Sequence, residues 1–108
     1  MSSHAASFVK FTIKAGKMSE MVDELKGVIP EYISLPGVLS MTFAQTGPNE
    51  IRSLVVYETM QALETNGPTL SAKLKGIMHL LEENEFERAV GEVVADSETR
   101  AACACTLM

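Results

Sequence analysis

The sequence predicts a single α+β domain in which the elements follow the order strand, helix, strand, strand, helix, strand. Short segments that alternate apolar and polar residues, as strands do, are separated by longer segments whose apolar residues recur every three or four positions, as in helices. The length of 108 residues is that of one domain. Hydrophobic residues make up 46 % and charged residues 21 % of the chain, which is ordinary for a globular protein.

The first strand and the first helix are expected in the N-terminal third of the chain. The segment FVKFTIKAGK, Phe8 to Lys17, alternates apolar and polar residues until Ala-Gly ends the pattern, which predicts a strand. Apolar residues then recur at three-four spacing over residues 19–34, which predicts a helix. Pro30 has no N–H for the helical hydrogen-bond ladder, so we expect a kink there, and Pro36 ends the helix.

The second and third strands are predicted over residues 39–46 and 51–59, and a tight turn joins them as a hairpin. Between LSMTFAQT and IRSLVVYET stands GPNE, whose Gly, Pro and Asn are typical of a tight turn. The following QALETNG predicts a short helical turn that is interrupted at Asn66-Gly67.

The second long helix is expected to begin at Pro68 and to end near Asn84. A proline fits the first turn of a helix, where N–H groups have no helical partner. The segment FERAVGEVVA, residues 86–95, predicts the fourth strand. This order is the ferredoxin-like βαββαβ unit, an antiparallel four-stranded sheet with two helices on one face.

We expect a flexible N-terminus over residues 1–7, the folded domain over residues 8–95 and a tail over residues 96–108. Both cysteines, Cys103 and Cys105, lie in the tail and cannot form a disulfide framework in the core. The last four residues, CTLM, match the prenylation pattern at Cys105. A single lipid chain binds membranes only marginally and no basic cluster precedes it, so the favoured interpretation is a tail with exposed thiols.

The charge pattern argues against nucleic acid as a partner. The net charge is −5, and no cluster of Lys and Arg offers a basic face to phosphates. The N-terminus, MSSHAASF, lacks the charged and apolar regions of a secretory signal. No apolar run approaches the roughly 18 residues of a membrane span. We therefore expect a soluble cytoplasmic protein without a membrane partner.

Both faces of the third strand are apolar, which predicts self-association. Val55 and Tyr57 lie on one face, and Leu54 and Val56 lie on the other. Two helices cover only one face of a four-stranded sheet, and a large exposed apolar patch is unusual on a monomer. We expect a two-fold homodimer with its sheets facing, since such dimers are the commonest closed assemblies. A monomer with a mixed outer face is the alternative.

Three landmarks carry a resemblance to a known family. They are FVKFTIKAGK, LPGVLSMTF and VVYETMQALE, and with the helix after Pro68 they extend the resemblance over about residues 8–95. In these the chain resembles the dimeric α+β barrel superfamily, most closely the antibiotic biosynthesis monooxygenase-like domain, with the stress-responsive branch a close competitor. The resemblance implies a pocket between the helices and the sheet of each protomer. Some members oxidise quinols or phenols without metal or flavin, and others degrade haem.

The chain departs from this family where its chemistry is usually placed. There is no Trp, and Met60 takes the place where a Trp often follows Tyr-Glu; the histidines common in the next segment are absent. The remaining candidates for a substrate site are Tyr57 and Tyr32, which would orient the substrate, Thr12, which would help to hold it, and Met60. For each tyrosine, core packing with a satisfied O–H is the alternative.

No metal or cofactor is expected. Helical spacing places His79 on the polar face, His4 lies in the N-terminus, and no acidic or histidine cluster has metal-ligand spacing. The leading hypothesis is a homodimer that binds a small apolar or aromatic molecule and acts as a cofactor-independent monooxygenase on a small aromatic or quinol. The alternatives are a non-catalytic, stress-associated binding dimer and a lipid-anchored interaction module. The sequence leaves open whether the protein is an enzyme.

Overall fold

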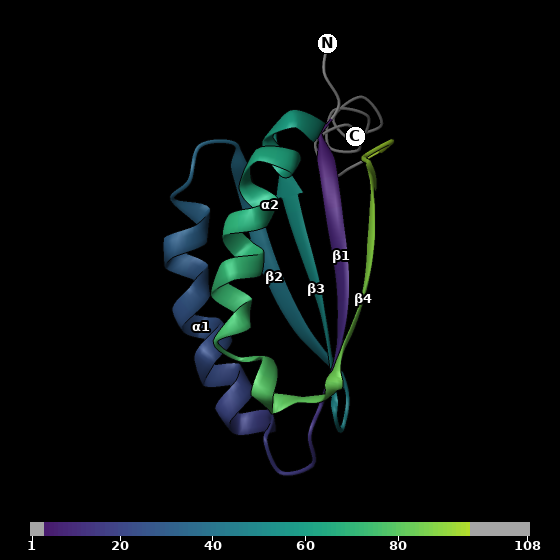
Figure 1. Cartoon of the computed structure of the whole chain (residues 1–108). Coiled ribbons are helices and arrows are strands. Elements are labelled where there is room, and N and C mark those ends of the chain that lie inside the picture. Colours follow the sequence, from purple (N-terminus) through teal and green to yellow (C-terminus); the bar gives the residue numbers. More distant parts are fainter. Residues whose placement is uncertain (1–3, 96–108) are drawn as a thin grey trace, which may run out of the picture.

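The computed structural model describes residues 4–95, with the side chains of residues 83–86 left out of the description. The elements are β1 (Ala5–Ile13), α1 (Met18–Ile33), β2 (Val38–Gly47), β3 (Glu50–Tyr57), α2 (Met60–Lys75), a 3₁₀ turn (Met78–Leu80) and β4 (Leu81–Glu92). The strands form one sheet in the order β2-β3-β1-β4, and every neighbouring pair is antiparallel. Both helices pack on the same face (Figure 1). The ferredoxin-like fold predicted from the sequence is confirmed. The prediction for Cys105 lies outside the described residues.

The central strand β1 begins earlier than expected. It starts at Ala5 rather than Phe8, so residues 5–7 belong to the sheet and not to a flexible N-terminus. Ala5 pairs with Tyr57 on β3 and with Glu92 on β4, and both Ala5 and Ser7 are buried. Small residues carry a weak apolar signal, which is why the alternating pattern does not reveal this part of the strand.

The second half of the chain differs most from the prediction. Helix α2 is continuous from Met60 to Lys75, so the expected interruption at Asn66-Gly67 and the expected start at Pro68 are both wrong. Its beginning is capped by Thr59, whose hydroxyl accepts a hydrogen bond from the Ala62 N–H at 3.1 Å. The helix also ends before Asn84, and β4 begins at Leu81 rather than at residue 86.

Asn66 explains why the helix runs through a turn-like sequence. Its side-chain amide donates to the Pro36 carbonyl and to the Ala62 carbonyl, both at 2.9 Å. These bonds satisfy a buried polar group and join α2 to the loop that enters β2. Tertiary contacts therefore override the low helix propensity of Asn66, Gly67 and Pro68.

Helix α1 also passes through a proline. Pro30 is exposed and the helix continues to Ile33, with Met21, Leu25 and Tyr32 turned to the core. The core consists of two clusters on the helix-covered face of the sheet. One surrounds Phe11 and Ile13, and the other surrounds Tyr32 and Tyr57.

The outer face of the sheet is not covered by a helix (Figure 1). Strand register places Leu54 and Ala89 on either side of Phe8. The exposed fraction is 51 % for Phe8 and 37 % for Leu54. A shallow depression of about 290 Å³ lies over this face and includes Phe8, Leu54 and Val56 in its lining. The sequence prediction of an apolar outer surface thus agrees with the placement of these side chains.

Candidate functional site

Two of the predicted site residues form a buried pair. The hydroxyls of Tyr32 on α1 and Tyr57 on β3 are 2.7 Å apart, and the rings meet edge to face at 86°. The Tyr32 hydroxyl also lies 2.9 Å from the main-chain carbonyl of Asn66. Because a carbonyl can only accept, Tyr32 donates to Asn66 and Tyr57 donates to Tyr32. Both tyrosines have an exposed fraction of 0 %.

The buried surroundings keep both tyrosines neutral. Burial is the largest cause that raises the pKa of Tyr32 and of Tyr57 above the ordinary value for tyrosine. The negative charge of an ionised Tyr57 would raise the pKa of Tyr32 further. Neither hydroxyl can therefore act as a base near neutral pH, and neither lines the cavity that is described below. Their arrangement is that of core tyrosines with satisfied hydroxyls.

We expect the free energy of unfolding to be level around neutral pH and to fall above about pH 10, the tyrosine pKa in unfolded chains. A tyrosine whose pKa is raised by folding binds its proton more tightly in the folded state, so this contribution is complete below the unfolded pKa and is lost as the pH rises towards the folded pKa. Urea unfolding at several alkaline pH values measures the decline. Tyr57→Phe should make it shallower; an unchanged slope would contradict the assignment.

The other two predicted site residues, Met60 and Thr12, lie on opposite sides of the sheet. Met60, the first residue of α2, is half-buried and packs against the cluster that contains Tyr32 and Tyr57. Thr12 alternates with the buried Phe11 and Ile13, which places it on the outer face of the sheet. The sheet therefore separates Thr12 from the tyrosines, and the four candidates do not form one site.

A cavity of about 250 Å³ lies on the helix-covered face, between α2 and the strands β1 and β4. The apolar part of its lining is formed by Val9, Leu70, Leu74 and Met78. The polar part is formed by Ser7, Ser71, Lys75 and Arg88, and Gly67 completes the lining. The cavity opens towards a wider outer depression that shares Ser71, Lys75 and Arg88 and adds Glu64. An apolar wall with a few polar groups at one side is the usual form of a small-molecule site.

Arg88 is the main charged group of this cavity. It lies on β4 opposite Val9, and its Nε donates to the hydroxyl of Ser7 at 3.3 Å. A Cβ atom added at Gly67 would stand 3.6 Å from a guanidinium nitrogen of Arg88, so this side chain reaches the backbone of α2. Burial raises the pKa of Tyr32 and Tyr57, while the charge of Arg88 acts to lower it, so the guanidinium is within electrostatic reach of the pair.

Sequence reasoning missed this cavity, although one signal was present. In the segment FERAVGEVVA, Arg88 falls between Phe86 and Val90 in the alternating pattern, where an apolar residue is expected. Arg88 is exposed on this edge strand, and its side chain reaches the cavity from there. The contribution of Ser7 could not be found, because residues 1–7 were expected to lie outside the sheet.

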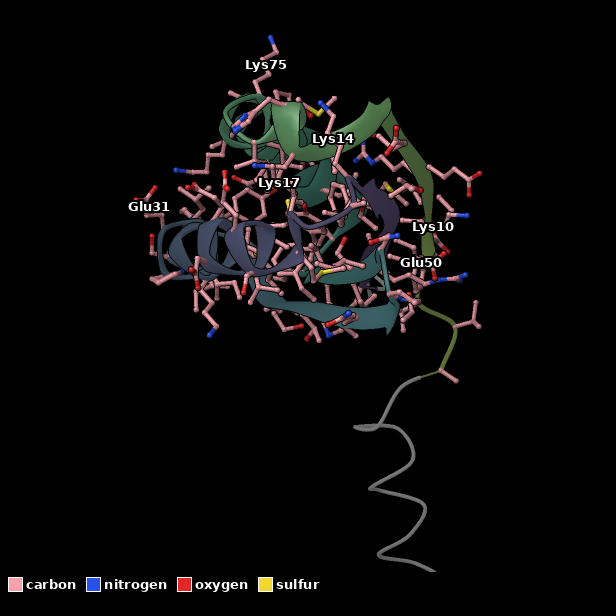
Figure 2. The ribbon with its side chains drawn as sticks, turned by 90° about the horizontal axis from the view of Figure 1, so that it is seen from below. Lys10, Lys14, Lys17, Glu31, Glu50 and Lys75 are labelled. Atoms are coloured by element: carbon pink, nitrogen blue, oxygen red, sulfur yellow. The ribbon has the colours of Figure 1, made fainter. Side chains whose placement is uncertain are left out.

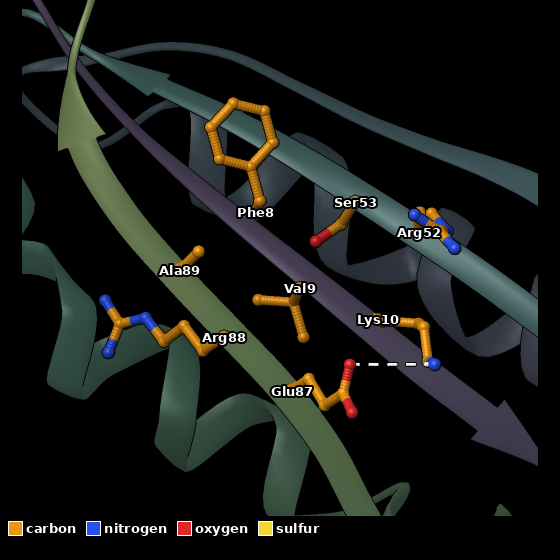
Figure 3. A pocket seen from close by; sticks show the side chains of 8 residues that line it. All are labelled: Phe8, Val9, Lys10, Arg52, Ser53, Glu87, Arg88 and Ala89. Carbon is orange, nitrogen blue, oxygen red and sulfur yellow. Dashed lines mark ion pairs between the residues drawn. The ribbon is translucent and has the colours of Figure 1, made fainter.

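A second depression, on the outer face, has a different character (Figure 3). Lys10 Nζ lies 3.6 Å from Glu87 and 3.9 Å from Glu50, and Arg52 Nε lies 3.2 Å from Glu50. Figure 2 shows Lys10 and Glu50 close together at this side of the molecule. Hydrogen bonds from Thr46 and Arg52 lower the pKa of Glu50. These charges satisfy one another at the surface and contribute little to stability.

Neither histidine lines the cavity beside α2 or the depression around Lys10. His79 lies exposed in the 3₁₀ turn, 3.9 Å from Glu20, and His4 stands 3.1 Å from the Glu58 carbonyl. Among the side chains that the structure describes, no three His, Cys, Asp or Glu are gathered as a metal site. Within residues 4–95, no helix is long and apolar enough to cross a membrane.

Comparison with known proteins agrees with the fold. A protein of unknown function from Nitrosomonas europaea is 17 % identical, with a TM-score of 0.78 over 87 % of this chain and 92 % of its own. SnoaB, a cofactor-independent oxygenase from Streptomyces nogalater, is 12 % identical, with a TM-score of 0.73 over 88 % and 97 %. Rv0793 from Mycobacterium tuberculosis is 16 % identical, with a TM-score of 0.75 over 88 % and 99 %. At these identities the likeness shows the fold alone.

The sequence comparison identifies the family. Among proteins of curated function, none matches the chain in sequence. The model of the antibiotic biosynthesis monooxygenase family matches residues 6–65, from β1 into the first part of α2. This is more than half of the 108 residues, and the sheet order and the two helices on one face agree with it. The chain belongs to the antibiotic biosynthesis monooxygenase family.

Proposed function

We propose that the protein is a cofactor-independent monooxygenase that binds a small aromatic or quinol compound in the cavity between α2, β1 and β4. The observation that carries this proposal is the cavity itself, with its apolar wall and the guanidinium of Arg88 at one side. Membership of the monooxygenase family supports the class of reaction. The cytoplasmic location expected from the sequence belongs to the same proposal.

The chemistry follows from what the lining can offer. A quinol O–H loses its proton, and the anion shares its negative charge with a ring carbon that bears one hydrogen. That carbon reduces O₂ to a hydroperoxide, which collapses to a carbonyl and one water. Arg88 would stabilise the negative charge as it develops, and the apolar wall would exclude water. Glu64, which lines the outer depression, is the described carboxylate available as the proton acceptor.

Closing the cavity should reduce turnover strongly. Ser71 is exposed on α2 and lines the cavity, so Ser71→Trp is expected to block it without disturbing the core. We expect the rate of O₂ consumption with 1,4-naphthohydroquinone, corrected for autoxidation, to fall to about a tenth or less, on the scale of lost positioning. The matched control is Thr69→Trp, at an exposed position of the same helix outside the lining. Equal turnover in the two folded variants would overturn the cavity as the active site.

One observation favours the alternative of a non-catalytic binding protein. Among the described residues that line the cavity, none is a histidine or a carboxylate, and the tyrosine pair is closed off behind α2. A protein that binds the quinol with sensitivity to Ser71→Trp, yet consumes no O₂ above the uncatalysed rate, would establish this function instead.

The proposal includes a homodimer with the sheets facing. The exposed Phe8 and Leu54, with Val56 beside them, form a continuous apolar area on the uncovered face, and a second copy of the same face is its simplest complement. The charged group around Lys10 and Glu50 would lie at the border of this contact.

A further inference from the structure

The charge of Arg88 is not balanced by an acidic side chain of the described part of the protein. A guanidinium has five N–H donors, and within that part its hydrogen bond is the one to the neutral hydroxyl of Ser7. Two lysines near the helices and the sheet differ from it. Lys73 pairs with Glu31, and Lys10 pairs with Glu50 and Glu87. Arg88 therefore keeps donors available at the wall of the cavity.

Lys75 adds a second cation at the mouth. It lies in the last turn of α2 and lines both the cavity and the outer depression, together with Arg88. Figure 2 shows its side chain extending outward from the end of the helix. No described acidic side chain forms an ion pair with it. The two cations make one side of the cavity positive, although the chain as a whole carries a charge of −5.

We propose that the natural ligand is an amphipathic anion, with an apolar ring body and one carboxylate or phenolate. The ring would pack on Leu70, Leu74 and Met78, and the anionic group would accept hydrogen bonds from Arg88. The charge of Lys75, at the mouth of the cavity, would attract the anionic group over a longer distance. This inference rests on the proposed use of the cavity, but it adds a preference for charge that family membership does not supply. Both cations lie beyond residues 6–65, which the family model covers.

A pair of ligands that differ in charge but not in the ring tests the inference. We expect the protein to bind 2-naphthoate about tenfold more tightly than 2-naphthamide at low salt, measured by isothermal titration calorimetry, which is the scale of one charge-assisted hydrogen bond. The preference for 2-naphthoate should weaken as NaCl screens the charges at the cavity mouth, whereas the affinity for 2-naphthamide should change little.

Substitutions test which side chain causes the preference for the anionic ligand. Arg88→Gln, which keeps hydrogen bonding and removes the charge, is expected to bring the two affinities within about twofold of each other, and Arg88→Lys should restore part of the difference. Lys75→Gln should lower the affinity for 2-naphthoate by about twofold, since its charge is exposed to solvent. Lys14→Gln is the matched control, because this exposed lysine lies outside the lining and the variant makes the same change in net charge.

The outcomes separate this inference from the proposed function. Equal binding of both ligands, abolished for both by Ser71→Trp, would overturn the preference for anions and leave the cavity as the binding site. A preference that survives Arg88→Gln in a folded protein would overturn the assignment to Arg88. Binding of neither ligand to the unchanged protein would overturn both proposals together.

Discussion

Phe8→Glu is expected to convert the proposed dimer into a monomer at micromolar concentration. Phe8 lies at the middle of the uncovered sheet face, between Leu54 and Ala89, and half of its surface is exposed. Burying the exposed half of both Phe8 rings in a two-fold contact contributes about 3 kcal/mol together, which corresponds to about 100-fold in the dimer dissociation constant. The substitution also places two carboxylates in the apolar contact, which raises the cost.

Sedimentation equilibrium over a range of protein concentrations measures this effect directly. Ile33→Glu is the matched control, because Ile33 is a large exposed apolar residue on α1, at the helix side of the molecule. This variant should stay dimeric. A monomeric unchanged protein, or a Phe8→Glu variant with an unchanged dissociation constant, would contradict the facing-sheet arrangement.

Gly37→Ala is expected to lower the free energy of unfolding by about 2–4 kcal/mol, the sum of a left-handed backbone cost and an overpacking cost. Gly37 has a φ of 87°, which disfavours any residue with a Cβ. A Cβ at this position would also stand 2.7 Å from the Cβ of Ala62 on α2. The loop before β2 and the helix would have to separate, which would also strain the hydrogen bond from Asn66 to Pro36.

A second glycine separates the two causes. Gly16 has a φ of 78°, yet an added Cβ there meets nothing within 4 Å. Gly16→Ala should therefore cost only the backbone contribution, about 1 kcal/mol. Urea unfolding of both variants supplies the comparison. If Gly16→Ala and Gly37→Ala lower the free energy of unfolding equally, the close approach to Ala62 adds no cost of its own.

Local sequence patterns were sufficient to predict the fold. The alternation around Val9, Phe11 and Ile13 predicts a strand with one buried face, and the structure buries all three of these side chains on the helix-covered side. The order of strand and helix patterns then leaves the ferredoxin-like unit, which the sheet order confirms. These predictions succeed because a residue's periodic position decides which face it presents, whatever its distant neighbours are.

Other features depended on contacts between residues far apart in the chain. The sequence from Thr65 to Pro68 has the composition of a turn, but the bond from Asn66 to the Pro36 carbonyl is made only when α2 packs against the loop before β2. Tyr32 and Tyr57 were candidates for a substrate, but their mutual hydrogen bond and burial make them part of the core.

The sequence by itself therefore determined the order of the elements, the apolar outer face and the resemblance that family membership later confirmed. The tertiary structure decided which polar side chains share a space. It placed Thr12 on the far side of the sheet from the tyrosines, and it brought Arg88 of β4 beside Ser7 of β1 and Gly67 of α2. The physical reason is that strand alternation gives a side chain its face, whereas its neighbours on that face come from pairing and packing across long sequence separations.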